Sequence, residues 1–177
     1  MKATQHLPLA NALRNRVLTL ATALFLTLGS LAPLTAQAGA PSSGVPFVNV
    51  LADARKVAEL NSGWKIFKVQ GQSMEPHFGG NSLLLAAHTE FKDLRTGMLV
   101  VYKDATGDLV AHRIIESTAQ GWIAKGFNND KVDPNLVTGD NLQGVVFGIF
   151  NYKSGTDNNF AQTDTQNNLP VAFAKTY

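Results

Sequence analysis

The sequence predicts a mainly β protein, built as a small antiparallel coiled sheet or partial barrel with one short helix near the N-terminus. Its 45% share of apolar residues is ordinary for a globular chain. Several short segments are rich in Val, Ile, Leu and aromatic residues, and turns that contain Gly or Asn separate them. No helix long enough to connect parallel strands lies between these segments, so neighbouring strands are expected to pair in an antiparallel manner.

Local patterns predict the elements in chain order. Within residues 48–60 the apolar side chains recur at close to helical spacing, which predicts one short helix with Val50, Leu51, Ala54, Val57 and Leu60 on its inner face. The later apolar segments are typical of strands and cover residues 64–69, 82–87, 98–103, 109–117, 122–125 and 144–152. Turn residues separate them at 79–81, 106–108 and 120–121.

The two ends of the chain differ from this central region. Residues 1–38 combine Arg14 and Arg16, an apolar run over 17–28 and a small residue at each end of 36–38, which is typical of a signal peptide cleaved after Ala38. A retained membrane anchor is the alternative, and both arrangements place the rest of the chain outside the cytoplasm, in the periplasm or secreted. The predicted organisation is a signal peptide at 1–38, a linker with the short helix at 39–61, a β domain at 62–152 and a polar, mobile tail at 153–177.

Charge and cysteine content exclude several kinds of function. The chain has 15 Lys and Arg residues against 13 Asp and Glu residues. Three of the basic residues and none of the acidic ones lie in 1–38, so the rest of the chain carries a slight negative charge. A basic surface for nucleic acid is therefore not expected. The absence of cysteine excludes disulfide bonds, a thiol nucleophile and cysteine-ligated zinc.

The first candidate for chemistry is the segment 69–77, where a predicted strand ends in a glycine-containing turn. This turn presents Ser73, and Pro76 stiffens its exit. A hydroxyl at the end of a strand is a plausible nucleophile, and successive backbone N–H groups in such a turn can bind an oxyanion. Serine is also a common turn residue without a chemical role, so Ser73 alone leaves both interpretations open. Met74 is interpreted as a core or pocket-lining side chain.

The second candidate is His112, in the predicted strand 109–117. By the two-residue period of a strand, Val110, His112 and Ile114 share one face. A histidine among apolar neighbours can simply be a hydrogen-bonded core residue. As a general base it needs an oxygen nucleophile within about 3 Å and a partner for its other ring nitrogen, which Ser73 and an aspartate could supply.

The third candidate is the polar loop 125–134, which contains Asp130 and Asp133. Either carboxylate could orient His112. The loop could also bind calcium through its oxygens, but it lacks the regular spacing and the final glutamate of an EF-hand loop. Asn and Asp are also frequent in turns because their side chains bond the local backbone. We expect no metal site and no cofactor.

Together, the three segments resemble the serine proteases of the signal peptidase clan, and within it the signal peptidases of the endoplasmic-reticulum and archaeal type. The resemblance runs from about Lys68 to about Phe150 and consists of six blocks in the family's order. Ser73 to Pro76 is similar to the family's S-M-x-P box, whose serine is the nucleophile. The other blocks lie at 80–85, 96–102, 110–115, 125–133 and 144–146, and the third of these is similar to the family's I-V-H-R-V-I strand.

The resemblance implies the fold of the signal peptidase and LexA-type peptidases, and a serine endopeptidase that cuts exported precursor proteins after small residues. Bacterial type I signal peptidases have a lysine where this chain has His112, so histidine implies a Ser–His form, with Ser73 as nucleophile and Asp133 orienting the base. The implied oxyanion and substrate-binding residues are Ser73, Gly71, Met74 and Pro76. The implied partner is an exported protein or peptide that pairs as an extended strand beside Ser73, and any membrane contact would come from residues 1–38.

Three departures from the family pattern keep other interpretations open. Asn81 and Met98 stand where the family has aspartates in its two Gly-Asp turns, and Phe127 stands where it usually has another. A non-catalytic family member that serves as a binding or assembly module outside the cytoplasm is therefore the main alternative. A Ser–Lys enzyme that uses Lys125 or Lys103 is a further one, although neither lysine stands at the matching position.

Overall fold

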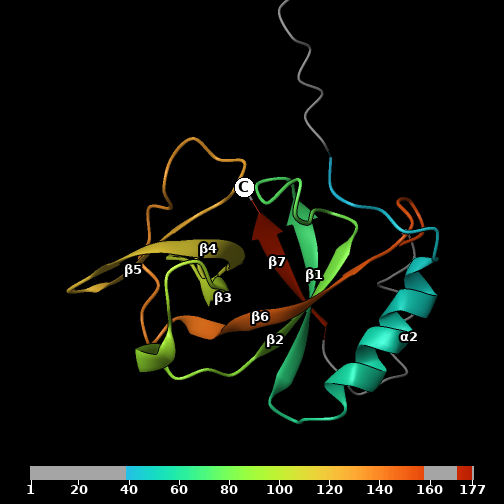
Figure 1. The fold of residues 1–177 in the computed structure, drawn as a ribbon, viewed down its shortest axis with the longest axis horizontal. Coiled ribbons are helices and arrows are strands. Elements are labelled where there is room, and N and C mark those ends of the chain that lie inside the picture. Colours follow the sequence, from blue (N-terminus) through green and yellow to red (C-terminus); the bar gives the residue numbers. More distant parts are fainter. Residues whose placement is uncertain (1–38, 158–170, 177) are drawn as a thin grey trace, which may run out of the picture. The chain divides into compact units, whose positions relative to one another are not determined.

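The computed structural model describes residues 39–157 and 171–176, and it confirms the mainly β fold. Its strands are β1 (Trp64–Gly71), β2 (Ser82–Ala87), β3 (Leu99–Lys103), β4 (Leu109–Thr118), β5 (Gly121–Lys125), β6 (Leu142–Asn151) and β7 (Val171–Thr176). They follow one another in the order β3-β6-β2-β1-β7-β4-β5, and β4 also pairs with β3. That additional pairing closes six strands into a barrel, and β5 extends the sheet beyond β4 (Figure 1). The predicted signal peptide lies outside the described residues.

The first six strands agree with the predicted segments to within two residues at each end. Their pairings are antiparallel: β1 with β2, β2 with β6, β6 with β3, β3 with β4, and β4 with β5. The connections β3–β4 and β4–β5 are short turns, and none of the five connections contains a helix of crossover length, which explains the antiparallel arrangement.

Strand β7 departs from the expectation of an entirely antiparallel sheet, because it pairs in parallel with β1 and β4. It also lies inside 153–177, so the prediction of a mobile tail is wrong for residues 171–176. These six residues are mostly apolar, but they follow a long polar segment, so the average composition of 153–177 does not indicate a strand. Residues 158–170, which make up most of the predicted tail, lie outside the described residues.

One α-helix, α2 (Phe47–Ala58), packs against β1, β2 and β6 (Figure 1). Its buried side chains recur at helical spacing, as the sequence predicts, and they are Phe47, Val50, Leu51, Ala54 and Ala58. Leu60, which was expected on this face, lies beyond the end of the helix and is 77% exposed. A short 3-10 helix, η1 (Phe91–Asp93), lies between β2 and β3. In 39–157 and 171–176, no helix is long and apolar enough to cross a membrane.

The core consists of three apolar clusters, of which two surround the site described below. The first lies under α2. The second fills the barrel and contains Phe67, Val69, Met74, Phe78, Leu84, Ala86, Val101, Ala111 and Ala174. The third lies mainly between β3, β4 and β5 and contains Leu94, Val100, Tyr102, Val110, Ile114, Ala124 and Val137. The turn after β1 and the middle of β4 are therefore both fixed by buried side chains.

Candidate active site

Ser73 lies just beyond the end of β1, in a tight turn. The strand ends at Gly71, whose φ of 111° is readily adopted by glycine and lets the chain leave the strand direction. Ser73 is 3% exposed and Met74 is 1% exposed. Because the Met74 side chain belongs to the cluster that fills the barrel, it anchors the turn that presents the serine. Pro76, which follows a cis peptide bond, is exposed at the exit of the turn.

His112 lies in the middle of β4, on the face that the strand period predicts. It is 1% exposed, and its neighbours on that face, Val110 and Ile114, are also buried. In the ladder, His112 is opposite Val100 of β3. Close packing on this side of the sheet restricts the rotamers that the imidazole ring can adopt.

A continuous chain of hydrogen bonds joins the three residues that the sequence analysis combined. Ser73 Oγ lies 2.7 Å from His112 Nε2, and His112 Nδ1 lies 2.6 Å from Asp133 Oδ2. A carboxylate can only accept, so Nδ1 carries the proton and Nε2 accepts from the serine hydroxyl. The His112 and Asp133 side chains are 1% and 8% exposed, so little water competes for these bonds. In the described part of the chain, neither Lys125 nor Lys103 makes a hydrogen bond to Ser73.

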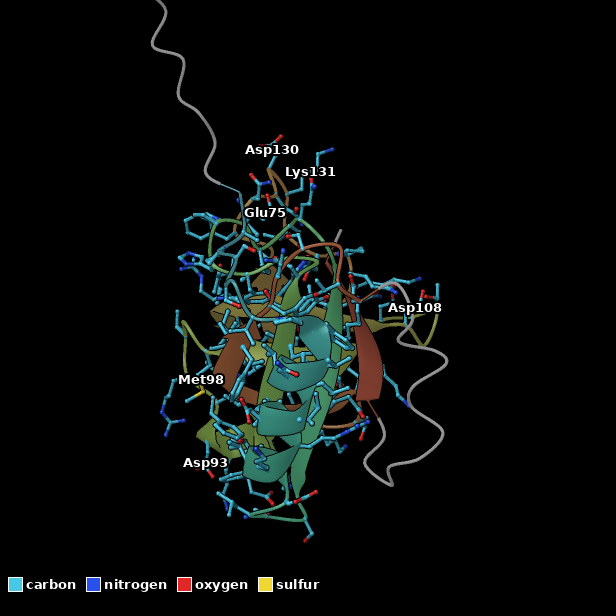
Figure 2. The ribbon with its side chains drawn as sticks, turned by 90° about the vertical axis from the view of Figure 1, so that its right-hand side faces the viewer. Glu75, Asp93, Met98, Asp108, Asp130 and Lys131 are labelled. Carbon is cyan, nitrogen blue, oxygen red and sulfur yellow. The ribbon has the colours of Figure 1, made fainter. Side chains whose placement is uncertain are left out.

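Asp133, rather than Asp130, is the carboxylate that meets His112. Its backbone N–H donates to the carbonyl of Ala124 at 2.8 Å, which fixes the loop to β5. The Tyr102 hydroxyl donates to Oδ2 of Asp133 at 2.7 Å, so the oxygen that faces the histidine has two donors. Asp130 is exposed at the outer end of the same loop, beside Lys131 (Figure 2).

Three residues whose roles sequence reasoning missed hold the site together. Tyr102 supports Asp133, and the alternation of β3 predicts that it is buried but not which residue it contacts. The backbone N–H of Asn128 donates to the Ser73 carbonyl at 2.6 Å. A Cβ atom added to Gly126 would lie 2.8 Å from the Cβ of Ser73, so glycine allows the loop to approach the serine closely.

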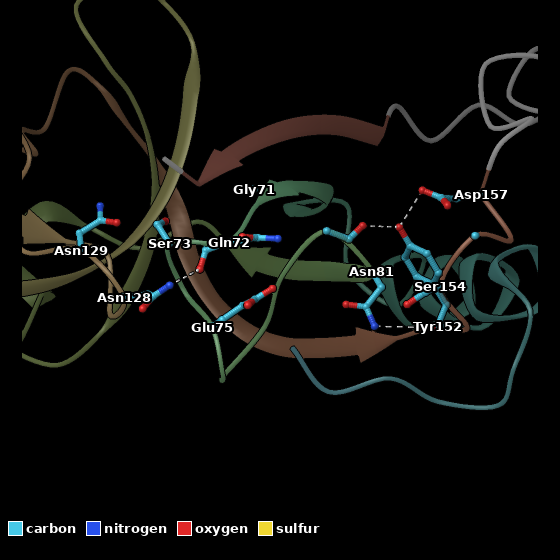
Figure 3. A pocket seen from close by; sticks show the side chains of 12 residues that line it. Gly71, Gln72, Ser73, Glu75, Asn81, Asn128, Asn129, Tyr152, Ser154 and Asp157 are labelled. Carbon is cyan, nitrogen blue, oxygen red and sulfur yellow. Dashed lines mark hydrogen bonds between the residues drawn. The ribbon is translucent and has the colours of Figure 1, made fainter. Parts of the chain in front are cut away.

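A cleft of about 750 Å³ opens beside Ser73 (Figure 3). Of the predicted substrate-binding residues, Gly71 and Ser73 line it, whereas Met74 lines a smaller cavity of about 200 Å³. Polar side chains dominate the walls of the cleft, among them Gln72, Glu75, Asn81, Asn128, Asn129, Tyr152 and Asp157. The space next to the serine hydroxyl is therefore large enough for several residues of a peptide.

An ion pair fixes the far end of this cleft. Lys68 Nζ lies 2.8 Å from Asp157, and the Tyr152 hydroxyl lies 3.0 Å from the same carboxylate. Burial opposes ionisation of Asp157, but the hydrogen bonds and charge of Lys68, together with the Tyr152 hydroxyl, hold the pKa of Asp157 below its ordinary value. Burial, and then the nearby Asp157 charge, raises the pKa of Tyr152 far above its ordinary value. The tyrosine therefore remains a neutral donor at physiological pH.

Within residues 39–157 and 171–176, no group of three or more His, Cys, Asp or Glu side chains is arranged to hold a metal ion. In the loop 125–134, the carboxylate of Asp133 is instead used by His112 and Tyr102. The groups in hydrogen-bond contact at the site are a hydroxyl, an imidazole and a carboxylate.

The sequence is similar to a signal peptidase. It is 32% identical over 92 residues to signal peptidase I W of Bacillus subtilis (strain 168). The match covers 49% of this chain and 48% of the relative, so the chain spans about half the length of the curated relative that it matches. No family model and no solved structure matches the sequence. The similarity is a distant homology to signal peptidase and does not distinguish between the subtypes of that family.

Proposed function

We propose that the chain is a serine endopeptidase of the signal peptidase kind, which cleaves exported precursor proteins after small residues by a Ser–His–Asp mechanism. The observation that carries the proposal is the unbroken hydrogen-bond chain from Ser73 Oγ through His112 to Asp133. The distant homology to signal peptidase supports the substrate class. The histidine at the position of the base supports the Ser–His subtype, and the compartment proposed is the periplasm or the exterior of the cell.

In the first half of the reaction, His112 Nε2 takes the hydroxyl proton of Ser73 while Oγ attacks the scissile carbonyl carbon. The carbonyl oxygen becomes an oxyanion, for which the Ser73 N–H is the proposed donor. Among the described residues no hydrogen bond uses this N–H, so it is available to the substrate. The imidazolium then gives its proton to the leaving amine as the C–N bond breaks, which leaves an acyl group on Ser73.

In the second half, His112 removes a proton from a water molecule that attacks the acyl group, and then returns the proton to Ser73 Oγ as the product acid leaves. Asp133 accepts from Nδ1 throughout and stabilises the positive charge that forms on the ring. Its second donor, Tyr102, keeps the carboxylate oriented, and a hydrogen bond to a charged group contributes about 1.5–3 kcal/mol.

The departures from the family pattern have packing partners that leave this arrangement intact. The Asn81 amide donates to the carbonyl of Pro41 at 2.7 Å, so it fixes the turn before β2 in place of an aspartate. Phe127 packs its ring edge-on against His77, with 4.2 Å between the ring centroids. Met98 accepts a hydrogen bond through its sulfur from a backbone N–H in the same turn. The loss of the aspartates therefore does not leave these turns without support, which removes one argument for a non-catalytic binding module.

The test is cleavage of a precursor peptide that carries an Ala-x-Ala site, followed by mass spectrometry. We expect the wild type to cut after the second alanine, and Ser73→Ala and His112→Ala to be inactive. Asp133→Asn should lower kcat by about 10⁴, because it leaves the base in the wrong tautomer. Ser117→Ala and His88→Ala remove exposed residues of the same two types, and both should cleave like the wild type.

Two results decide against the proposal. Cleavage that persists in His112→Ala would show that another group acts as the base. A wild-type protein that binds the precursor without cutting it would instead support the binding or assembly module.

A further inference from the structure

Strand β7 fills the slot between the two strands that carry the candidate nucleophile and base. Strand β1 leads to Ser73, and strand β4 carries His112. These strands are not neighbours in the sheet, because β7 lies between them and pairs with both. Figure 1 shows β7 alongside β1 with both arrows pointing the same way. Without β7, the slot would expose two strand edges with unpaired N–H and C=O groups, which readily accept an extended chain.

The path of β7 leads toward the nucleophile. Its last residue, Thr176, is opposite Gly71, two residues before Ser73. Two residues of extended strand correspond to about 7 Å. In Figure 3 the arrowhead of β7 ends beside Gly71 and Ser73. An extended peptide lying in this slot in the same direction would therefore deliver its next peptide bonds to the serine hydroxyl.

The slot also restricts the size of the side chain that it accepts. Ala174 is 0% exposed and lies in the cluster that fills the barrel, where Val69 is its direct partner in the ladder. A larger side chain would need these close-packed neighbours to move. Lys175 instead pairs with the carboxylate of Asp108, in the turn just before β4. The groove therefore accommodates a small buried side chain, that of Ala174, followed by a half-exposed one, that of Lys175.

The register of β7 against β1 shows that β7 occupies the groove without being positioned as a substrate. Ala174 and Lys175 are opposite Val69 and Gln70. The peptide bond between Ala174 and Lys175 is therefore about three residues short of Ser73, or about 10 Å along the strand. In this register β7 fills the groove without presenting that bond to the hydroxyl.

We propose that β7 is an intramolecular occupant of the slot between β1 and β4, where the proposed substrate would pair beside Ser73, and that a substrate must displace it. This proposal rests on the proposed function, because it assigns the substrate to the groove beside Ser73. A tethered strand has an effective concentration of the order of millimolar. Free peptides therefore compete with β7 at a disadvantage, and the slot is occupied in the absence of substrate although the neighbouring cleft beside Ser73 is open.

A reversible disulfide provides the test, because the chain contains no cysteine of its own. Gln70 and Lys175 are direct partners in the parallel register, so the double variant Gln70→Cys/Lys175→Cys should lock β7 in the groove on oxidation. The probe is a fluorescein-labelled peptide that copies residues 171–176, whose binding is followed by fluorescence anisotropy. The same samples are assayed with the Ala-x-Ala precursor. Lys175→Cys alone, treated with the same oxidant, is the matched control.

We expect the oxidised double variant to bind the probe and cleave the precursor at least tenfold more weakly than the reduced form, with no such difference in Lys175→Cys. Equal probe binding before and after oxidation, or failure of the two cysteines to form a disulfide, would overturn the proposal. If only the reduced double variant binds the probe and no form of the protein cleaves the precursor, the groove proposal would be upheld and the proposed enzymatic function refuted. The two proposals therefore fail in different measurements.

Discussion

The contact between Gly126 and Ser73 leads to a quantitative prediction for Gly126→Ala. The new Cβ would lie 2.8 Å from the Cβ of Ser73 and 2.7 Å from the side-chain nitrogen of Asn129. Carbon atoms in contact prefer about 3.5–4.0 Å, so the serine or the loop must shift by about 0.7 Å or more. A misplacement of about 1 Å can cost about 10²-fold in rate. We therefore expect kcat to fall by about 10- to 100-fold and the free energy of unfolding to fall by about 1–3 kcal/mol.

Two measurements test this reasoning, namely steady-state cleavage of the precursor and urea unfolding of the same preparations. Gly139→Ala is the matched control, because a Cβ at Gly139 would be 3.8 Å from its nearest neighbour, an ordinary contact. That variant should retain the wild-type kcat and stability. Wild-type kcat in Gly126→Ala, measured on a folded protein, would refute the idea that this close approach positions the nucleophile.

Two further predictions concern hydrogen bonds to carboxylates. Tyr102→Phe removes one of the two donors to Asp133, so the free energy of unfolding should fall by about 1.5–3 kcal/mol. The same change should lower kcat about tenfold with little change in KM. An unchanged kcat would show that His112 alone suffices to orient the carboxylate. For Asp157, the depressed pKa in the folded state means that its stabilising contribution is complete above the ordinary value near 3.8 and is lost as the pH falls below it. Urea unfolding between about pH 5 and about pH 2 should therefore show a smaller acid-induced loss for Asp157→Asn than for the wild type, and identical losses would contradict the role of the pair with Lys68.

Most of the fold could be predicted because short apolar strands and their turns are local properties of the sequence. The helix and six strands follow from the periods of their apolar residues. Strand β7 was missed because it pairs in parallel with β1, which lies far earlier in the chain, and no local pattern records such a pairing. The end of α2 differed for a related reason, since Leu60 has the right spacing but lies beyond the last turn.

For the candidate site too, local patterns could be predicted from the sequence, whereas contacts between distant segments could not. Strand and turn patterns place Ser73 and His112, but each could also be an ordinary turn or core residue, and only the resemblance to the signal peptidase clan selects them together. Residue type alone leaves Asp130 and Asp133 equivalent, and it is the resemblance that implies Asp133. The physical basis of that choice, the hydrogen bond that fixes the loop to Ala124, is visible only in the structure. The role of Tyr102 was hidden for a similar reason. Its partner comes from a distant loop, and only the assembled barrel brings the two together.

The parallel pairing of β7 also has a consequence for the order in which the protein folds. The hairpins β1–β2, β3–β4 and β4–β5 join segments that are close in sequence, whereas β7 must return to β1 across most of the domain. Contacts between distant segments form late because loop closure costs entropy. The barrel is therefore expected to pass through a stage with Ser73 and His112 already in place and one seam still open. Until β7 docks, that seam is exposed to any extended chain nearby. The docking of this strand therefore also determines when the newly made protein can no longer pair with other polypeptides.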